Sequence, residues 1–194
     1  MRDDTFFSVD CETSGPFPGR HALLSVGVVV VRRERGRWVI GDSLYQEWAP
    51  SGAAEEDPAA TRVHGLNMAS LRAHGMNAVE GARELARWVS GHAGARRVFV
   101  GYNAAFDWAF VLHAFGAARI DSPFHHAPLD LKSAIWGSAG GNWQERGNLE
   151  TLGRLVGQSV APEGEERQHN AVDDARLQAR AFILLLEHLR ADAR

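Results

Sequence analysis

The chain has 194 residues, 45% hydrophobic and 23% charged, which is the composition of an ordinary globular protein with a full hydrophobic core. Its formal net charge of −3 excludes an overall basic field for nucleic acid, although local phosphate contacts remain compatible with it. One cysteine, Cys11, excludes an internal disulfide framework and fits a reducing compartment. No apolar run approaches the roughly 18 residues of a membrane span, and the N-terminus has acids where a signal peptide has bases. We therefore expect one domain over residues 1–194, no membrane segment and a cytoplasmic location.

The first predicted strand, residues 6–12 (FFSVDCE), ends in two acids. Its bulky residues favour a strand, in which successive side chains point to opposite faces. Asp10 and Glu12 would then lie side by side at the C-terminal end, with Cys11 as a small core residue behind them. Two neighbouring carboxylates repel each other unless positive charge lies between them. A site for a hard divalent cation such as Mg²⁺ or Mn²⁺ is one interpretation, and a solvated pair of acids is the other.

Two further strands are predicted before the first helix. Residues 23–31 (LLSVGVVVV) are apolar almost throughout, as in a strand that is covered on both faces. The arginine-rich residues 32–37 predict a hairpin tip, followed by a strand over residues 38–48. The arginines are interpreted as a solvated tip, with phosphate contacts as the alternative. The first three strands would form an antiparallel meander.

Helix signals dominate the rest of the chain. Asp57-Pro58 is typical of a helix start, and Asn77 followed by Glu80 resembles a capping box. The later predicted elements are a strand at 97–101, a helix from about 103 to 116, a short strand at 128–131, a short helix at 133–136, a loop at 138–147, a helix at 148–157 and a last helix at about 171–190. The buried stripe of the last helix is predicted as Val172, Ala175, Ala179, Phe182, Leu186 and Leu189. This order suggests an α/β fold with one mixed sheet and helices packed on it.

The segment 101–107 (GYNAAFD) combines a strand end, a turn and a helix start. It places Asp107 in the first turn of a helix, just beyond the C-terminal edge of a strand, where ligands bind in open α/β sheets. The alternative is an acid that a helix N-terminus favours for electrostatic reasons.

The segment 169–174 (HNAVDD) offers an imidazole and two acids at the start of the last helix. Positions 169 and 174 are about 140° apart around a helix, so His169 would reach in from the preceding loop or first turn. That arrangement suits a proton acceptor beside a metal ligand. Spacing alone does not decide between Asp173 and Asp174.

Three segments resemble, in order, the three motifs of the DEDD superfamily of 3′–5′ exonucleases: VDCETSG, YNAAFDWAFV and HNAVDDARLQA. Because the third segment contains a histidine, the chain resembles the DEDDh subclass in particular. This group includes polymerase proofreading subunits, ribonuclease T and oligoribonuclease, and the resemblance covers residues from about 5 to 185. It implies a ribonuclease-H-like mixed five-stranded sheet and a single 3′–5′ exonuclease domain. It also implies that the acids of the motifs ligate metal ions and that the histidine acts as general base. The ligands would be Asp10, Glu12, Asp107 and Asp174, and the base would be His169.

Substrate contacts are also implied by the resemblance, at Thr13, His64 and Asn103. His64 lies in VHGL, which resembles a family stretch against the terminal nucleotide, and a structural turn is its alternative role. Helix capping is the alternative role of Asn103. Phe17 and Trp143 are candidates for stacking on bases, with ordinary packing or exposure as the alternative.

The implied reaction is hydrolysis of the last phosphodiester of a single-stranded 3′ end of DNA or RNA, which releases a nucleoside 5′-monophosphate. Two divalent cations, Mg²⁺ or Mn²⁺, would be the cofactors, and His169 would accept the proton of the attacking water. Because relatives of this kind are often homodimers, the resemblance also implies that this chain can form a homodimer, for which the sequence itself carries no signal. The alternatives are a repair or proofreading nuclease bound to a DNA polymerase, which the short tail after Leu189 disfavours, and a catalytically inactive nucleic-acid-binding module.

Overall fold

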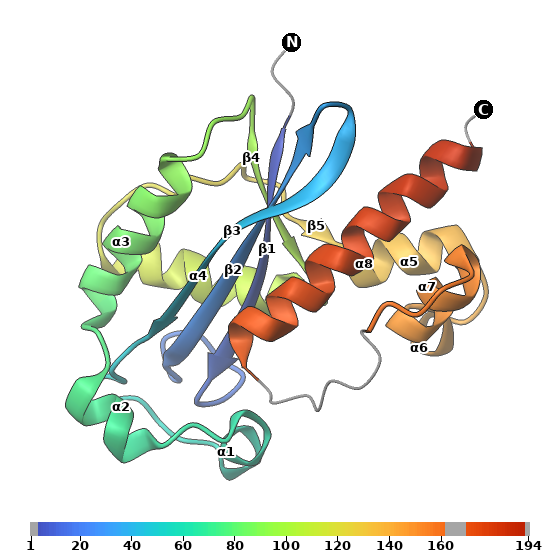
Figure 1. Cartoon of the computed structure of the whole chain (residues 1–194). Helices are drawn as coiled ribbons and strands as arrows, with labels where there is room; N and C mark the ends of the chain where they lie inside the picture. Colours follow the sequence, from blue (N-terminus) through green and yellow to red (C-terminus); the bar gives the residue numbers. More distant parts are fainter. Residues whose placement is uncertain (1–3, 162–169, 193–194) are drawn as a thin grey trace.

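A five-stranded mixed sheet forms the centre of the protein (Figure 1). The computed structural model describes residues 4–161 and 170–192. The strands are β1 (Thr5–Thr13), β2 (Leu23–Glu34), β3 (Arg37–Glu47), β4 (Arg97–Gly101) and β5 (Leu129–Asp130), in the order β3-β2-β1-β4-β5. The first three pair antiparallel, and β4 and β5 are parallel to β1. The predicted meander and the predicted mixed α/β sheet are therefore confirmed.

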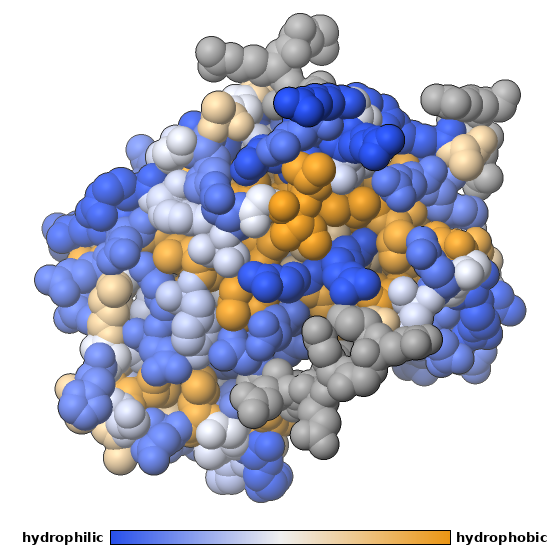
Figure 2. Space-filling model, viewed as in Figure 1, coloured by the Kyte–Doolittle hydropathy of each residue, from blue (hydrophilic) through white to orange (hydrophobic). Residues whose placement is uncertain are grey.

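Helices cover both faces of this sheet. They are α1 (Pro58–His64), α2 (Met68–His74), α3 (Ala78–Ser90), α4 (Ala105–Ala117), α5 (Leu131–Ala139), α6 (Trp143–Arg146), α7 (Leu149–Val156) and α8 (Ala171–Asp192). Figure 1 shows α8 crossing the front of the sheet and α3 and α4 on the other side. Figure 2, in the same view, shows mostly hydrophilic side chains on the front surface around a smaller apolar patch. In the described ranges, no helix has the length and apolar character needed to cross a bilayer.

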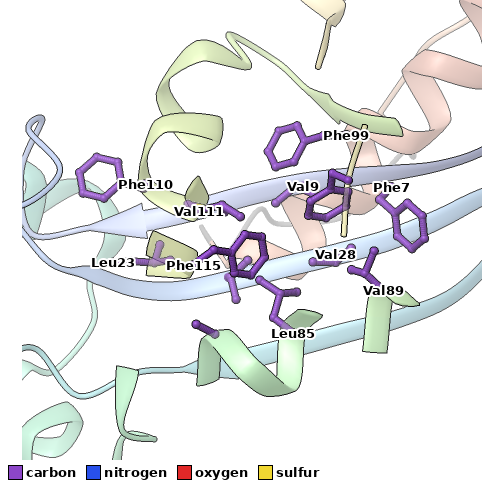
Figure 3. Close-up of a cluster of buried hydrophobic side chains, with 14 of the residues drawn as sticks. Phe7, Val9, Leu23, Val28, Leu85, Val89, Phe99, Phe110, Val111 and Phe115 are labelled. Carbon is purple, nitrogen blue, oxygen red and sulfur yellow. The ribbon is translucent and has the colours of Figure 1, made fainter. Parts of the chain in front are cut away.

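Alternation along the strands creates two hydrophobic cores. Phe7 and Val9 of β1 face the α3–α4 side, where they pack with Leu85, Phe99 and Phe115 (Figure 3). Cys11 belongs to the same core, as predicted. On the opposite face, Phe6 packs edge-to-face against Phe182 of α8, with ring centroids 4.9 Å apart. Asp10 and Glu12 therefore leave β1 on the face that α8 covers.

Three expectations about single segments are wrong. Residues 138–147 are not loop throughout, because α6 forms one short helix inside them, with Asn142 accepting a hydrogen bond from the backbone of Gln144. Leu189 is 46% exposed, because it lies near the end of α8, whose buried side chains include Leu185 instead. Asn103 does not cap α4. It has a left-handed φ of 68°, and α4 begins after Ala104 with no side-chain hydrogen bond at its cap among the described residues.

The C-terminal ends of β1 and β4 lie at one edge of the sheet, because these neighbouring strands run parallel. The β2–β3 hairpin tip lies toward the opposite edge, since Phe6 pairs with Val31 near the tip whereas Glu12 pairs with Ser25 far from it. The arginines of the tip are therefore remote from Asp10 and Glu12, which supports the interpretation of a solvated tip.

Candidate active site

Asp10 and Glu12 begin the site at the end of β1. Both are half-buried and lie on the same face of the strand, two residues apart. Asp10 pairs with Gly27 of β2 in the sheet, and Glu12 pairs with Ser25. Because Gly27 and Ser25 are small, another element of the fold can approach the two carboxylates.

That element is the first turn of α8, and Gly27 allows it to approach. A Cβ atom at position 27 would lie 2.2 Å from the carbonyl carbon and oxygen of Ala171, so only glycine fits there without a backbone shift. Asn170 precedes the helix, and its side-chain oxygen accepts a hydrogen bond from the backbone N–H of Val172 at 3.0 Å. The start of α8 is thus held directly over the position next to Asp10.

Asp174 completes a group of three acids. One oxygen from each of Asp10, Glu12 and Asp174 lies within 4.8 Å of the others. Asp173, the alternative left open by the sequence, is exposed, whereas Asp174 is half-buried. The structure therefore places Asp174, and not Asp173, with the acids of β1.

Asp107 lies behind this group, in the first turn of α4. It is only 4% exposed, and its Oδ1 accepts a hydrogen bond from the backbone N–H of Cys11 at 3.0 Å. Since Cys11 separates Asp10 from Glu12 in the chain, this bond holds the fourth carboxylate against the same end of β1.

Burial and neighbouring carboxylates disfavour the ionisation of Asp10, Glu12 and Asp107. Burial raises the pKa of Asp107 to about 7, although hydrogen bonds from Cys11 offset part of the rise. Burial, and then the charge of Asp174, raises the pKa of Glu12 to about 7. Burial and the neighbouring carboxylates also raise the pKa of Asp10. Such mutual repulsion is what a nearby cation relieves.

The donor set fits a hard divalent cation. It consists of carboxylate oxygens, which Mg²⁺ and Mn²⁺ prefer, and three of them are close enough together to face one ion. Among the described residues, burial and neighbouring carboxylates raise the pKa values of Glu12 and Asp107 to about 7. A bound cation would favour the ionised form of each carboxyl group, so cation binding and proton release are coupled here.

His169, the expected base, lies outside the described residues. The structure resumes at Asn170, immediately before the helix turn that carries Asp174.

The three expected substrate contacts lie on three separate segments of the chain. Thr13, at the end of β1, donates a hydrogen bond from its hydroxyl to the carbonyl of Gly15 at 2.9 Å. His64 ends α1, is 5% exposed, and accepts a hydrogen bond at Nδ1 from the N–H of Leu66 at 2.9 Å. Asn103 is exposed in the turn between β4 and α4. The hydrogen bonds of Thr13 and His64 lie within their own turns, which agrees with the structural role considered for His64.

Gln178 belongs to the site although the sequence argument did not single it out. It is 6% exposed, and its Nε2 donates a hydrogen bond to Asp10 Oδ1 at 2.7 Å. Its position four residues after Asp174, on the same face of α8, was the available signal. The role of Gly27 could not be predicted, because a glycine in an apolar strand does not indicate which part of the backbone packs against it.

Comparisons with known proteins identify the family. A family model described as "Exonuclease" matches residues 7–182. The chain is 35% identical over 191 residues to the 3′-5′ DNA exonuclease Cap18 of Escherichia coli, covering 95% of this chain and 94% of that protein. It is 28% identical to the Ribonuclease T of Marinobacter nauticus, covering 94% of this chain and 82% of that one.

A solved structure shows the same fold. The nuclease domain of 3′hExo, described as a DEDDh family member bound to rAMP, superposes with a TM-score of 0.74 at 14% identity, covering 95% of this chain and 92% of that one. The predicted fold class and the predicted resemblance are therefore both confirmed. The chain belongs to the exonuclease family and is a 3′–5′ exonuclease.

Proposed function

We propose that the protein removes nucleoside 5′-monophosphates one at a time from single-stranded 3′ ends of DNA or RNA, in a reaction that requires two divalent cations, Mg²⁺ or Mn²⁺. The observation that carries the proposal is the convergence of acids from distant parts of the chain on one end of β1. Both kinds of sugar are included because one relative is named a DNA exonuclease and another Ribonuclease T.

In this proposal Asp10, Glu12, Asp107 and Asp174 hold the cations. When bound, the cations would make the attacking water more acidic and stabilise the negative charge that develops on the scissile phosphate. The acids are suited to this role because burial and mutual repulsion have already raised the pKa values of Glu12 and Asp107 to about 7. A cation that enters the site replaces protons there at neutral pH.

His169 is proposed as the general base. A histidine imidazole in its neutral form can accept a proton from water at a ring nitrogen. The oxygen of that water would bond to phosphorus as the bond from phosphorus to the 3′ oxygen breaks. The shortened chain then leaves with a 3′ hydroxyl, and the released nucleotide keeps the 5′ phosphate.

A single strand is the proposed substrate because the terminal base must separate from any partner to enter the site. Among the described residues, Phe17 is 58% exposed in the turn after β1, and Trp143 is 39% exposed in α6. Both are proposed to stack on bases. Thr13, His64 and Asn103 are proposed to contact the terminal nucleotide. A cytoplasmic location and one exonuclease domain over residues 1–194 complete the proposal.

The test is a panel of single- and double-stranded DNA and RNA substrates, each labelled at the 5′ end in one set and at the 3′ end in another. With Mn²⁺, wild-type protein should shorten 5′-labelled strands in a ladder and release labelled mononucleotide from 3′-labelled strands. Asp10→Ala, or EDTA, should nearly abolish both signals. Cleavage that begins at the 5′ end, or that persists in EDTA, contradicts the proposal. Size-exclusion chromatography and co-purification with a polymerase would decide whether the protein works as a monomer, a homodimer or a bound subunit.

A further inference from the structure

The side-chain amide of Gln178 connects three segments that carry the acids. Its Nε2 donates a hydrogen bond to Asp10 Oδ1 on β1 at 2.7 Å, and its Oε1 accepts one from the N–H of Tyr102 at 3.0 Å. Tyr102 lies between β4 and the helix that carries Asp107, and Gln178 lies one helical turn beyond Asp174. One buried amide therefore contacts or neighbours every segment that supplies an acid.

The orientation of this amide is determined by its partners. A backbone N–H can only donate a hydrogen bond, so the oxygen of Gln178 must face Tyr102. The nitrogen must then face Asp10, where an ionised carboxylate can only accept. Because the amide is 6% exposed, water does not readily substitute for either partner.

The Tyr102 end of this link is itself anchored. The hydroxyl of Tyr102 donates a hydrogen bond to the carbonyl of Gly147 at 3.0 Å, which ties it to the segment between α6 and α7. Rotation of the Gln178 amide would break a buried hydrogen bond at each end and leave buried polar groups unsatisfied, which is unfavourable. Asp10 Oδ1 is thus held by a rigid donor, which fixes the orientation of the Asp10 carboxylate beside the other acids.

We infer that Gln178 is a positioning residue that fixes the rotamer of Asp10, so that one carboxylate oxygen is presented to a divalent cation shared with Glu12 and Asp174. Gln178 acts through Asp10 and does not contact the substrate. The inference rests on the proposed cation-dependent function. Hydrogen-bond partners of metal ligands commonly contribute about 10–100-fold to metal affinity or activity.

The test compares Gln178→Met, which keeps the side-chain length but removes both hydrogen bonds, with Gln158→Met, the same change at an exposed glutamine after α7. The first measurement is isothermal titration of Mn²⁺ into protein without nucleic acid. Gln178→Met should weaken Mn²⁺ binding about 10-fold or more, whereas Gln158→Met should bind Mn²⁺ as wild type does.

The second measurement is a hydrolysis assay. The kcat of Gln178→Met should fall at limiting Mn²⁺ and recover in part at high Mn²⁺. The KM for the oligonucleotide should stay within about twofold of wild type, because Gln178 does not touch the substrate.

Wild-type Mn²⁺ affinity in Gln178→Met overturns the inference, even if its melting temperature falls, because that pattern shows a structural role only. If Gln178→Met does not fold, Gln178→Asn retains an amide that is one methylene too short to bridge both partners, and the same loss of Mn²⁺ affinity is expected. Failure of the proposed function itself gives a different result, since wild-type protein would then show no Mn²⁺-dependent release of mononucleotides.

Discussion

At the scale of single residues, the choice between Asp173 and Asp174 is the sharpest that the structure makes. The two acids are adjacent in the chain, but only Asp174 lies with Asp10 and Glu12. Periodicity could not separate them, because the direction in which the first turn of α8 faces depends on its packing against β2. Gly27, where the backbone of Ala171 passes close to the sheet, determines that packing.

Asp174→Asn should therefore lower kcat/KM by about 10²–10³-fold, since a metal site typically supplies several kcal/mol of transition-state stabilisation. Asp173→Asn, with the same change of charge at the exposed neighbouring position, should stay within about twofold of wild type. Both are measured as release of mononucleotide from a labelled oligonucleotide with Mn²⁺. Equal losses in the two variants would mean that the net charge of this helix turn matters and the position of the carboxylate does not.

His169→Ala should slow hydrolysis by about 10²–10⁴-fold, the usual contribution of a general base. The affinity for Mn²⁺ should change little, because the cations are assigned to the four acids. The pH profile of the remaining activity should also lose the rise near the ordinary pKa of histidine. Wild-type activity of the variant at neutral pH would remove His169 from the mechanism.

The acids also predict how stability depends on pH. A carboxyl group whose pKa is raised on folding binds more protons in the folded state, so stability falls as pH rises from the unfolded pKa to the folded pKa. For Glu12 and Asp107 that window runs from their ordinary pKa values of 4.5 and 3.8 to about 7. In chelated protein, these two groups should lower the melting temperature between pH 5 and pH 8, by about 2–4 °C per kcal/mol lost.

Addition of Mn²⁺ should reverse this loss, and more strongly at pH 8 than at pH 5, because the cation binds the ionised carboxylates. Calorimetry at both pH values with and without Mn²⁺ measures the effect. Asp107→Asn should reduce the pH dependence. A melting temperature of the variant with the same pH dependence as wild type would show that Asp107 does not titrate in this window.

At the scale of elements, local sequence signals predicted much of the fold. Strand alternation placed Asp10 and Glu12 on one face, and Asp57 and Asn77 cap helices as predicted. The failures have tertiary causes. Asn103 resembled a cap, but the backbone N–H of Ala104 that precedes α4 is bound instead by Asp130 Oδ2 at 2.7 Å. A carboxylate 26 residues away cannot be identified from a local pattern.

The close approach of α8 to β2 gives a prediction at the same scale. Gly27→Ala introduces a Cβ atom against the backbone of Ala171, so it should destabilise the protein by about 1–3 kcal/mol, as overpacking usually does. It should also lower activity, because α8 must shift together with Asp174. Denaturant unfolding and the nuclease assay measure the two effects.

Gly137→Ala is the matched control. Position 137 lies in α5, where an added Cβ atom meets nothing within 4 Å. That variant should gain about 0.5–1 kcal/mol, since alanine is the better helix former. Gly27→Ala with wild-type stability and activity would contradict the account of how Asp174 is brought to β1.

At the scale of the whole molecule, the topology creates the site. Parallel pairing brings the C-terminal ends of β1 and β4 to one edge of the sheet, and α8 begins at this edge before it crosses the front of the sheet (Figure 1). Acids that are about 160 residues apart in the chain thereby come close together in space. No local sequence pattern indicates how close they lie. Their identities could be predicted from motifs, whereas the hydrogen bonds that orient them, above all that of Gln178, required the structure.

The central claim is that these acids hold divalent cations. The most direct measurement is the anomalous diffraction of Mn²⁺ in crystals of the wild-type protein. The account predicts Mn²⁺ peaks within coordination distance of Asp10, with Glu12 and Asp174 facing the same ions, and loss of those peaks in Asp10→Ala crystals. Protein that degrades 3′ ends with Mn²⁺ but shows no Mn²⁺ at this end of β1 would contradict the account.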